Sequence, residues 1–180
     1  KLEAFSAFLW KMIASMEHGS GKNSRMGIVV DGRKSLSEAM MTGYFGNVLS
    51  IPFREKSIGE LKERPLSWVA DEIHECLKTA VTKEHFLGLI DWVESHRPEP
   101  AMTKIYHSSG SEDDGPALVV SSGQRFPVSK VNFGWGKPLF GSYHFPWGGQ
   151  TGYVMPMPSP AENGDWVVYL HLSKRQLEQI

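Results

Sequence analysis

The chain has 180 residues, of which 41% are hydrophobic and 22% charged, a balance typical of one globular domain with a substantial core. Its formal net charge of -1 gives no electrostatic reason to expect nucleic acid as a partner, and no apolar run approaches the roughly 20 residues that span a bilayer, so we expect no membrane partner. The single cysteine, Cys76, excludes an internal disulfide and fits a reducing compartment, so we expect a cytoplasmic protein.

The first part of the chain alternates helix and strand patterns. Residues 2–16 place apolar side chains on one stripe at helical spacing, and because this helix begins part-way and without an initiator Met, we expect a fragment of a longer protein. The β-branched run at residues 26–30 predicts a mostly buried strand. Residues 44–55 predict a second strand that is interrupted near Pro52, because proline cannot donate to a sheet ladder.

Helical patterns dominate the middle of the chain. Ser57 and Glu60 have the spacing of a capping box, which predicts the start of a short helix. Residues 67–81 and 83–95 each carry apolar side chains on one face and predict two longer helices. Residues 108–116 contain no large apolar side chain, so we expect a solvated loop there.

The last part of the chain is rich in strand patterns. Residues 117–121, 152–157 and 166–172 predict strands, and the Asn-Gly-Asp sequence at residues 163–165 favours a hairpin between the last two. Residues 173–176 have capping-box spacing and predict a terminal helix. Together these patterns predict an α+β domain in which five or six strands carry helices packed on a face.

The stretch from residue 131 to residue 138 is the most unusual in the chain. It reads Val-Asn-Phe-Gly-Trp-Gly-Lys-Pro, so aromatic rings alternate with glycines before a proline. Glycine permits a positive φ or a close backbone approach, and Pro138 restricts the direction in which the chain leaves. A surface loop has little reason to have this composition, so we expect a buried, shaped turn.

This stretch resembles the Asp-Phe-Gly-Trp-Gly signature of the BAHD acyltransferases, a plant family that transfers acyl groups from CoA. One position departs, because Asn132 stands where the family usually has Asp. Other matches follow in the family's order and rough spacing: the helix at residues 2–10, Val30-Asp31-Gly32-Arg33, Gly43-Tyr44-Phe45-Gly46-Asn47, and the block with Ser121, Ser122, Arg125 and Pro127. The resemblance therefore assigns a structural motif to Arg33, Asn132, Phe133, Gly134, Trp135 and Gly136.

The resemblance implies a fold like that of chloramphenicol acetyltransferase, a mixed β-sheet with helices packed on it. Family members have two such domains, and residues 1–180 match the C-terminal one, so we expect the N-terminal domain to be a partner outside this chain. The two halves form a tunnel that acyl-CoA enters from one side and an alcohol or amine acceptor from the other. Acyl-CoA is then a co-substrate, and no permanently bound cofactor is implied.

Acyl transfer needs a general base, which the family supplies from a His-x-x-x-Asp motif in the N-terminal domain. No histidine of this chain has Asp four residues later; the histidines are His18, His74, His85, His96, His107, His144 and His171. We therefore expect no catalytic base in this chain and no turnover without the N-terminal half. The histidines also lack metal-ligand spacing, so no metal site is predicted.

Four expectations concern the signature and the block before it. The family's signature Asp is thought to pair with Arg33's counterpart, so we expect Asn132 to accept a weaker hydrogen bond from Arg33. Trp135 either lines the CoA channel or belongs to a turn that only holds the domain together, and the turn is favoured. Ser121 matches a Thr that in hydroxycinnamoyl-CoA shikimate transferases is thought to help bind the tetrahedral intermediate. The alternative is that Ser121 merely sits in a strand.

Gly123 stands where those enzymes have a Trp, so the indole is missing here. Its absence disfavours a shikimate or quinate acceptor and suggests a larger acceptor pocket.

The Tyr44 to Asn47 motif has two readings. By the resemblance, Tyr44 shapes the channel near CoA and Asn47 makes a polar contact to pantetheine or to backbone; equally, the motif only packs a strand end. Cys76 lies on the apolar face of a predicted helix, which favours a buried, inert thiol over a nucleophile.

A different class of function stays open beside the enzyme. Because the chain has no base of its own, it is alternatively a non-catalytic acyltransferase-like domain that binds a ligand or a partner. A condensation or carnitine-type acyltransferase of related fold fits the motifs less well. The donor, the acceptor and the choice between O- and N-acylation are not encoded in any motif we recognise.

Overall fold

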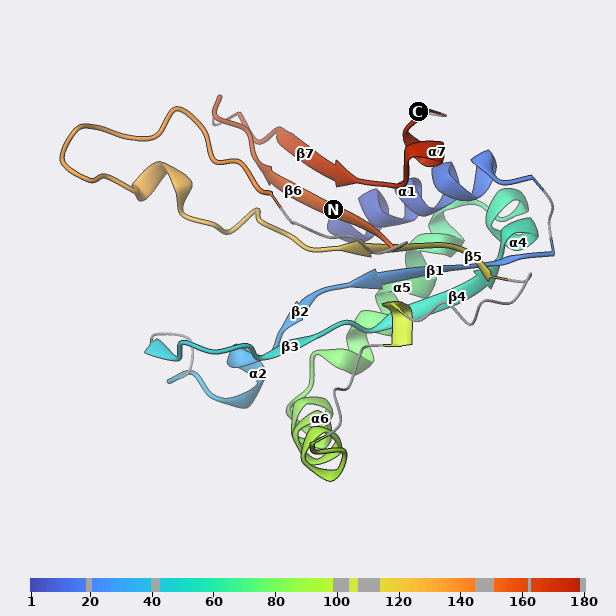
Figure 1. The fold of residues 1–180 in the computed structure, drawn as a ribbon, viewed down its shortest axis with the longest axis horizontal. Coiled ribbons are helices and arrows are strands. Elements are labelled where there is room, and N and C mark those ends of the chain that lie inside the picture. Colours follow the sequence, from blue (N-terminus) through green and yellow to red (C-terminus); the bar gives the residue numbers. More distant parts are fainter. Residues whose placement is uncertain are drawn as a thin grey trace.

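The structure is a computed structural model that describes residues 1–18, 21–39, 43–98, 104–106, 114–144, 151–161 and 163–178. Its centre is a five-stranded mixed sheet in the order β4-β1-β5-β6-β7 (Figure 1). The strands of this sheet are β1 (Asn23–Ile28), β4 (Phe53–Ser57), β5 (Asp114–Val120), β6 (Gly152–Pro158) and β7 (Trp166–His171). A two-stranded sheet of β2 (Val30–Asp31) and β3 (Leu49–Ser50) extends β1 and β4 beyond one edge.

The pairing of the strands decides where functional residues gather. The three central strands β1, β5 and β6 are parallel, and the outer strands β4 and β7 are antiparallel to their neighbours. The carboxyl ends of parallel strands meet at one edge of a sheet, where open sheets commonly hold ligands. We call this the carboxyl edge; it comprises residues 29–33, 121–124, 158–161 and 163–165, with the start of β4 beside them.

Helices cover one face of the sheet. Helix α1 (Leu2–Met16), α4 (Ile58–Glu63) and α5 (Leu66–Ala80) share one apolar cluster with alternate residues of the strands. A second cluster on the opposite face includes Ile105 of the 3₁₀ helix η1 (Lys104–Tyr106) and the methionines of β6. Leu118 belongs to the first cluster and Val119 to the second, so β5 is buried on both faces, as central parallel strands usually are.

One buried polar chain joins α1 to the sheet. Trp10 Nε1 donates to Ser24 Oγ at 2.9 Å, and Ser24 Oγ donates to the carbonyl oxygen of Pro116 at 2.7 Å. The tryptophan is fully buried, so this chain satisfies donors that would otherwise destabilise the core.

The remaining helices lie at the ends of the sheet. Helix α6 (Lys83–Ser95) follows α5 and packs near the short α2 (Arg33–Leu36), and α7 (Lys174–Leu177) follows β7 (Figure 1). A further 3₁₀ helix, η2 (Val128–Lys130), interrupts the long segment between β5 and β6. No helix among the described residues is long and apolar enough to cross a membrane.

Most of the expected elements are confirmed. The predicted helices at 67–81 and 83–95 are α5 and α6, and both capping boxes form, at Ser57 with Glu60 and at Ser173 with Gln176. The hairpin predicted at residues 163–165 joins the antiparallel pair β6 and β7.

Three expectations need correction. The strand predicted from residue 44 begins only at Leu49, although the interruption near Pro52 is real because it separates β3 from β4. Residues 114–116 belong to β5 rather than to a loop; Pro116 falls where the register of β1 with β5 shifts, which accommodates a residue that has no N–H to donate. Residues 108–113 lie outside the described residues. The described strands number seven, against five or six predicted, because the short β2 and β3 add a two-stranded sheet to the main sheet of five.

Candidate functional site at the carboxyl edge

Arg33 fixes the loop that carries the Tyr-Phe-Gly-Asn motif. Its Nη1 lies 2.8 Å from Asp31 Oδ2, and its Nη2 donates to the carbonyl oxygen of Gly46. Asp31 Oδ1 also accepts from the Arg33 backbone N–H at 3.0 Å. The Arg33 side chain is only 25% exposed, so the guanidinium is a partly buried clamp between the end of β2 and residues 44–47.

The expected pairing of Arg33 with Asn132 is wrong for this structure. Asp31, two residues before Arg33, supplies a full negative charge at contact distance, which makes a stronger bond than an amide oxygen would. Asn132 Oδ1 instead accepts from the backbone N–H groups of Gly134 at 2.8 Å and Gly136 at 3.4 Å. The two motifs are therefore satisfied separately.

A hollow of about 280 Å³ lies between the Arg33-held loop and α6, and we call it the Tyr44 hollow. Tyr44 and Asn47 both line it, which places the two predicted channel residues on one cavity. The other lining residues are Leu36, Val48, Leu49, Phe86, Leu89, Ile90, Val93 and Glu94. These walls are mostly apolar with one amide and one carboxylate, which suits a narrow chain that contains amide groups.

Gly32 explains why the hollow has a firm wall. A Cβ at Gly32 would lie 2.3 Å from Cε1 of Phe86, so the ring of Phe86 packs directly on the Asp-Gly-Arg backbone. Phe86 is buried on α6, and the neighbouring His85 places Nε2 2.8 Å from Ser50 Oγ of β3. These contacts hold α6 against the small sheet. No local sequence pattern predicted the Ser50–His85 pair, because the two residues come from separate elements.

Ser121 stands at the end of β5, as expected. Its backbone N–H donates to the carbonyl oxygen of Val154 at 2.8 Å, so it continues the β5–β6 ladder onto the carboxyl edge. Its side chain is partly exposed, so the hydroxyl belongs to a residue that a ligand at this edge would meet.

The larger acceptor pocket expected at Gly123 does not exist. Gly123 is buried, and a Cβ there would lie 2.0 Å from the Sδ of Met157 and 3.2 Å from the Sδ of Met155. Two buried methionines of β6 therefore fill the space that a side chain at position 123 would need. Glycine is required for packing at this position rather than for an open cavity.

The signature turn has the predicted shape but not the predicted burial. Gly134 and Gly136 have φ angles of 103° and 117°, which only glycine adopts readily. Phe133 is 73% exposed and Trp135 87% exposed. Because Asn132 holds the turn from within, the turn needs no burial to keep its shape, and its two aromatic rings lie near each other with 6.1 Å between their centroids. A role for Trp135 in lining a channel stays a prediction.

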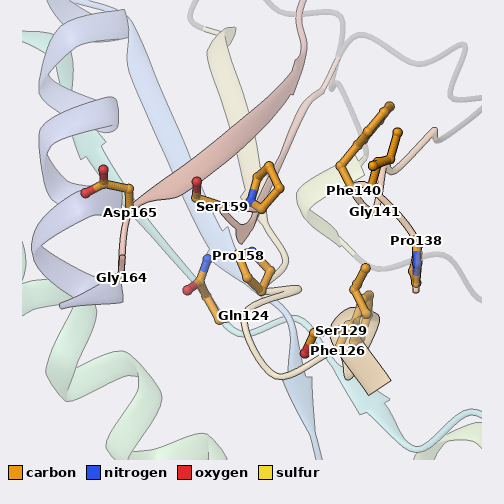
Figure 2. Close-up of a pocket in the computed structure, with 13 residues that line it drawn as sticks. Gln124, Phe126, Ser129, Pro138, Phe140, Gly141, Pro158, Ser159, Gly164 and Asp165 are labelled. Atoms are coloured by element: carbon orange, nitrogen blue, oxygen red, sulfur yellow. The ribbon is translucent and has the colours of Figure 1, made fainter. Parts of the chain in front are cut away.

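A second hollow, also of about 280 Å³, lies on the other side of the carboxyl edge, and we call it the Gln124 hollow (Figure 2). Its walls come from the segment after β5, from the arm after the signature turn, and from the β6–β7 turn. The lining residues are Gln124, Phe126, Val128, Ser129, Pro138, Leu139, Phe140, Gly141, Pro158, Ser159, Pro160, Gly164 and Asp165. Sequence reasoning missed this site because its three segments meet only in the folded chain.

Two tyrosines and the cysteine have perturbed acidities. Burial, together with the neighbouring Tyr153, raises the pKa of Tyr106 to about 12 and raises the pKa of Tyr143 further. Burial also raises the pKa of the Cys76 thiol, which is 8% exposed. The predicted burial of Cys76 is confirmed, and its inert role stays a prediction that the burial supports, because a thiol that resists ionisation is a poor nucleophile.

Comparison with known proteins identifies the family. A family model described as Transferase family matches residues 1–180. The chain belongs to this family, the BAHD acyltransferases. It is 24% identical to shikimate O-hydroxycinnamoyltransferase of Nicotiana tabacum over 98% of its length, and 28% identical to anthranilate N-benzoyltransferase protein 1 of Dianthus caryophyllus over 77%.

The chain spans less than half the length of these two BAHD relatives. It covers 39% of the tobacco protein and 31% of the Dianthus protein. Among solved structures, TRI101 of F. sporotrichioides, complexed with coenzyme A and T-2, matches with a TM-score of 0.75 at 16% identity, over 98% of this chain and 40% of that one. The expected α+β fold of the chloramphenicol acetyltransferase type is thereby confirmed.

Proposed function

We propose that residues 1–180 form the C-terminal half of a BAHD enzyme that transfers an acyl group from an acyl-CoA thioester to an alcohol or amine acceptor of plant specialised metabolism. The observation that carries the proposal is the family match over the whole chain, combined with coverage of only 39% of the tobacco relative. The N-terminal half is then the partner that carries His-x-x-x-Asp.

In this proposal the chain's own residues bind and orient the substrates. The Tyr44 hollow takes the pantetheine arm of CoA, with the Asn47 amide available to its amide groups and Arg33 holding the loop in place. Ser121, at the carboxyl edge, donates a hydrogen bond to the oxygen of the tetrahedral intermediate.

The reaction balances without a further co-reactant. The base in the N-terminal half removes the proton from the acceptor's hydroxyl or amino group as that atom forms a bond to the thioester carbon. The carbon–sulfur bond then breaks, and the proton passes to the sulfur, so that an ester or amide and free CoA leave. The two relatives are named for O- and N-acyl transfer respectively, and we leave the acceptor as either class.

The decisive experiment measures CoA release with a thiol reagent. The chain is assayed alone and together with an N-terminal half, bearing His-x-x-x-Asp, from a family member, using acetyl-CoA and benzoyl-CoA with a panel of alcohols and amines. We expect release only from the combination, and none when the histidine of the added half is replaced by alanine. Saturable turnover by the chain alone would contradict the two-part proposal.

Ser121→Ala tests the role of the serine, and Ser122→Ala is its matched control. The neighbouring Ser122 Oγ accepts from the Gln124 N–H and so has a local structural role. In the combined enzyme we expect Ser121→Ala to lower kcat at least about tenfold, and Ser122→Ala to leave it nearly unchanged. Equal effects of the two variants would remove Ser121 from the reaction.

A non-catalytic binding domain is the second candidate, favoured by one observation: no histidine of the chain is followed by Asp four residues later. Calorimetry of the chain with CoA discriminates the two. CoA binding without turnover in any combination favours a binding domain, whereas turnover in the combination favours the enzyme.

A further inference from the structure

The side-chain amide of Gln124 is unsatisfied. Its Nε2 is buried and has no hydrogen-bond partner among the described residues, although the residue lines a cavity. Buried amide donors in proteins nearly always have partners, and an exception at the wall of a cavity needs an explanation. A ligand in the cavity supplies one.

The backbone around Gln124 is fixed by hydrogen bonds, so only a rotation of the side chain can bring its buried amide nitrogen to a ligand. Gly123 N–H donates to the carbonyl oxygen of Pro156 at 3.0 Å, and the Gln124 N–H donates to Ser122 Oγ at 3.4 Å. The last torsion of a glutamine side chain has a broad potential, so rotation of the amide costs little. Figure 2 shows Gln124 among Pro158, Ser159 and the Gly164–Asp165 turn, where rotation would direct its N–H groups into the hollow.

The walls of the Gln124 hollow select a particular ligand chemistry. Most of the lining is aromatic, aliphatic or proline, from Phe126, Leu139, Phe140 and the three prolines. Asp165 is the only charged residue among the described residues that line the hollow. Asn163 holds Asp165 in place, since its Nδ2 donates to Asp165 Oδ2 at 2.7 Å and its Oδ1 accepts from the Asp165 N–H at 3.1 Å. A cation lies beside this turn, since Lys1 Nζ donates to the carbonyl oxygen of Gly164 at 3.4 Å, but Lys1 is not one of the lining residues. Among the described lining residues, the charge that an anionic ligand would meet is therefore the Asp165 carboxylate.

We propose that the Gln124 hollow binds a neutral compound with a single aromatic ring, whose carbonyl oxygen accepts a hydrogen bond from Gln124 Nε2. A volume of about 280 Å³ is near the lower limit for small-molecule sites and accommodates one ring with a short substituent. Phe126 and Phe140 supply ring contacts, and the prolines form flat apolar walls. This site is separate from the Tyr44 hollow and requires no acyl transfer.

The test is an NMR titration of the ¹⁵N-labelled 180-residue chain with benzamide, and with benzoate as an anion of the same shape. We expect saturable shifts of the Gln124, Ser159 and Asp165 amide signals with benzamide, and affinity for benzoate at least about tenfold weaker. Asp165→Asn should bring the two affinities close together. Equal affinities in the unaltered chain, or shifts confined to other segments, would overturn the proposal.

Gln124→Met separates a binding site from a packing defect. Methionine keeps the length of the side chain and removes the unpaired donor, so we expect a higher Tm together with about fivefold weaker benzamide binding. A higher Tm with unchanged binding would mean that the amide is merely unsatisfied. Asp165→Asn alters a residue of an exposed turn and remains informative if the Gln124 variant does not fold.

Discussion

Replacing Gly123 with alanine tests the packing at the carboxyl edge. The new Cβ would lie 2.0 Å from the Sδ of Met157 and 3.2 Å from the Sδ of Met155, and real Cβ atoms do not approach other atoms as closely as the first distance. The backbone cannot retreat freely, because Gly123 N–H is bonded to the carbonyl oxygen of Pro156 at 3.0 Å. Met157 must therefore move.

The movement of Met157 determines the magnitude. Methionine is flexible, but Met157 is only 3% exposed and packs in the second core cluster, so its sulfur has little free space. Inserting one methyl group into a well-packed core costs about 1–3 kcal/mol. For a domain of this size that corresponds to a fall in Tm of about 2–12 °C.

The assay is a double-mutant cycle by denaturant unfolding. Met157→Ala alone should cost about 2–5 kcal/mol, because it leaves a cavity. In that background, Gly123→Ala adds its methyl group to empty space, so the double variant should be more stable than the sum of the single effects predicts by about 1–3 kcal/mol. Gly88→Ala is the matched control, since a Cβ at that helical position has no neighbour within 4 Å and alanine favours the helix.

Either of two results would refute the reasoning. If Gly123→Ala destabilises the chain equally in both backgrounds, Met157 does not fill the space beside position 123. If instead Gly123→Ala is neutral in the unaltered chain, the position is open, and the acceptor pocket first expected there regains support.

Three further predictions concern charged and titrating groups. Arg33→Ala should lower the free energy of unfolding by about 1–3 kcal/mol and speed hydrogen exchange in residues 43–48. Arg33→Lys should restore only part of this loss, because lysine is a point charge that cannot bond Asp31 and Gly46 together as the guanidinium does. Unchanged exchange in Arg33→Ala would exclude the clamp. Hydrogen bonds from Ser57 lower the pKa of Glu60 below its ordinary 4.5, so the Glu60 carboxylate stabilises the fold above pH 4.5 and this stabilisation is lost as pH falls through the lowered pKa. Glu60→Gln should therefore flatten the acid side of a curve of Tm against pH, and an unchanged slope would count against this role of Glu60. Burial raises the pKa of Tyr106 from 10 to about 12, so the contribution of the neutral phenol to stability is complete below pH 10 and is lost as pH rises towards 12. Tyr106→Phe should therefore reduce the fall in Tm at alkaline pH.

The elements that sequence predicted best are those with local causes. Helix α6 begins at Lys83 and ends at Ser95, as its apolar spacing and the N-cap Thr82 indicate. The two capping boxes are equally local, since the serine and its partner lie three residues apart. The predicted start of β5 was wrong because the observed start depends on a strand far away in the sequence. Pro116 enters the sheet only through the shifted register with β1.

The candidate site shows the same division. Asp31 and Arg33 are two residues apart, so the sequence was sufficient to predict their pairing. The family pattern instead predicted a pairing of Arg33 with Asn132. Glycine in place of an indole at position 123 predicts a larger pocket if only the local sequence is considered. The prediction fails because Met157, far along the chain, fills that space. The Gln124 hollow has no local signature, because its walls come from three separate segments.

The exposed signature turn has a consequence for the proposed two-part enzyme. Its shape depends on Asn132 Oδ1 and on two glycines with positive φ, all within the turn itself, so the turn is formed before anything covers it. Phe133, Trp135 and the following Leu139 and Phe140 are 61–89% exposed, which is a large apolar surface for a stable monomer. A surface that is already ordered loses little conformational entropy when a partner docks. Asparagine at position 132 is therefore no defect in this chain: it orders the exposed aromatic turn that the proposed N-terminal half would bury, while Asp31 independently neutralises Arg33.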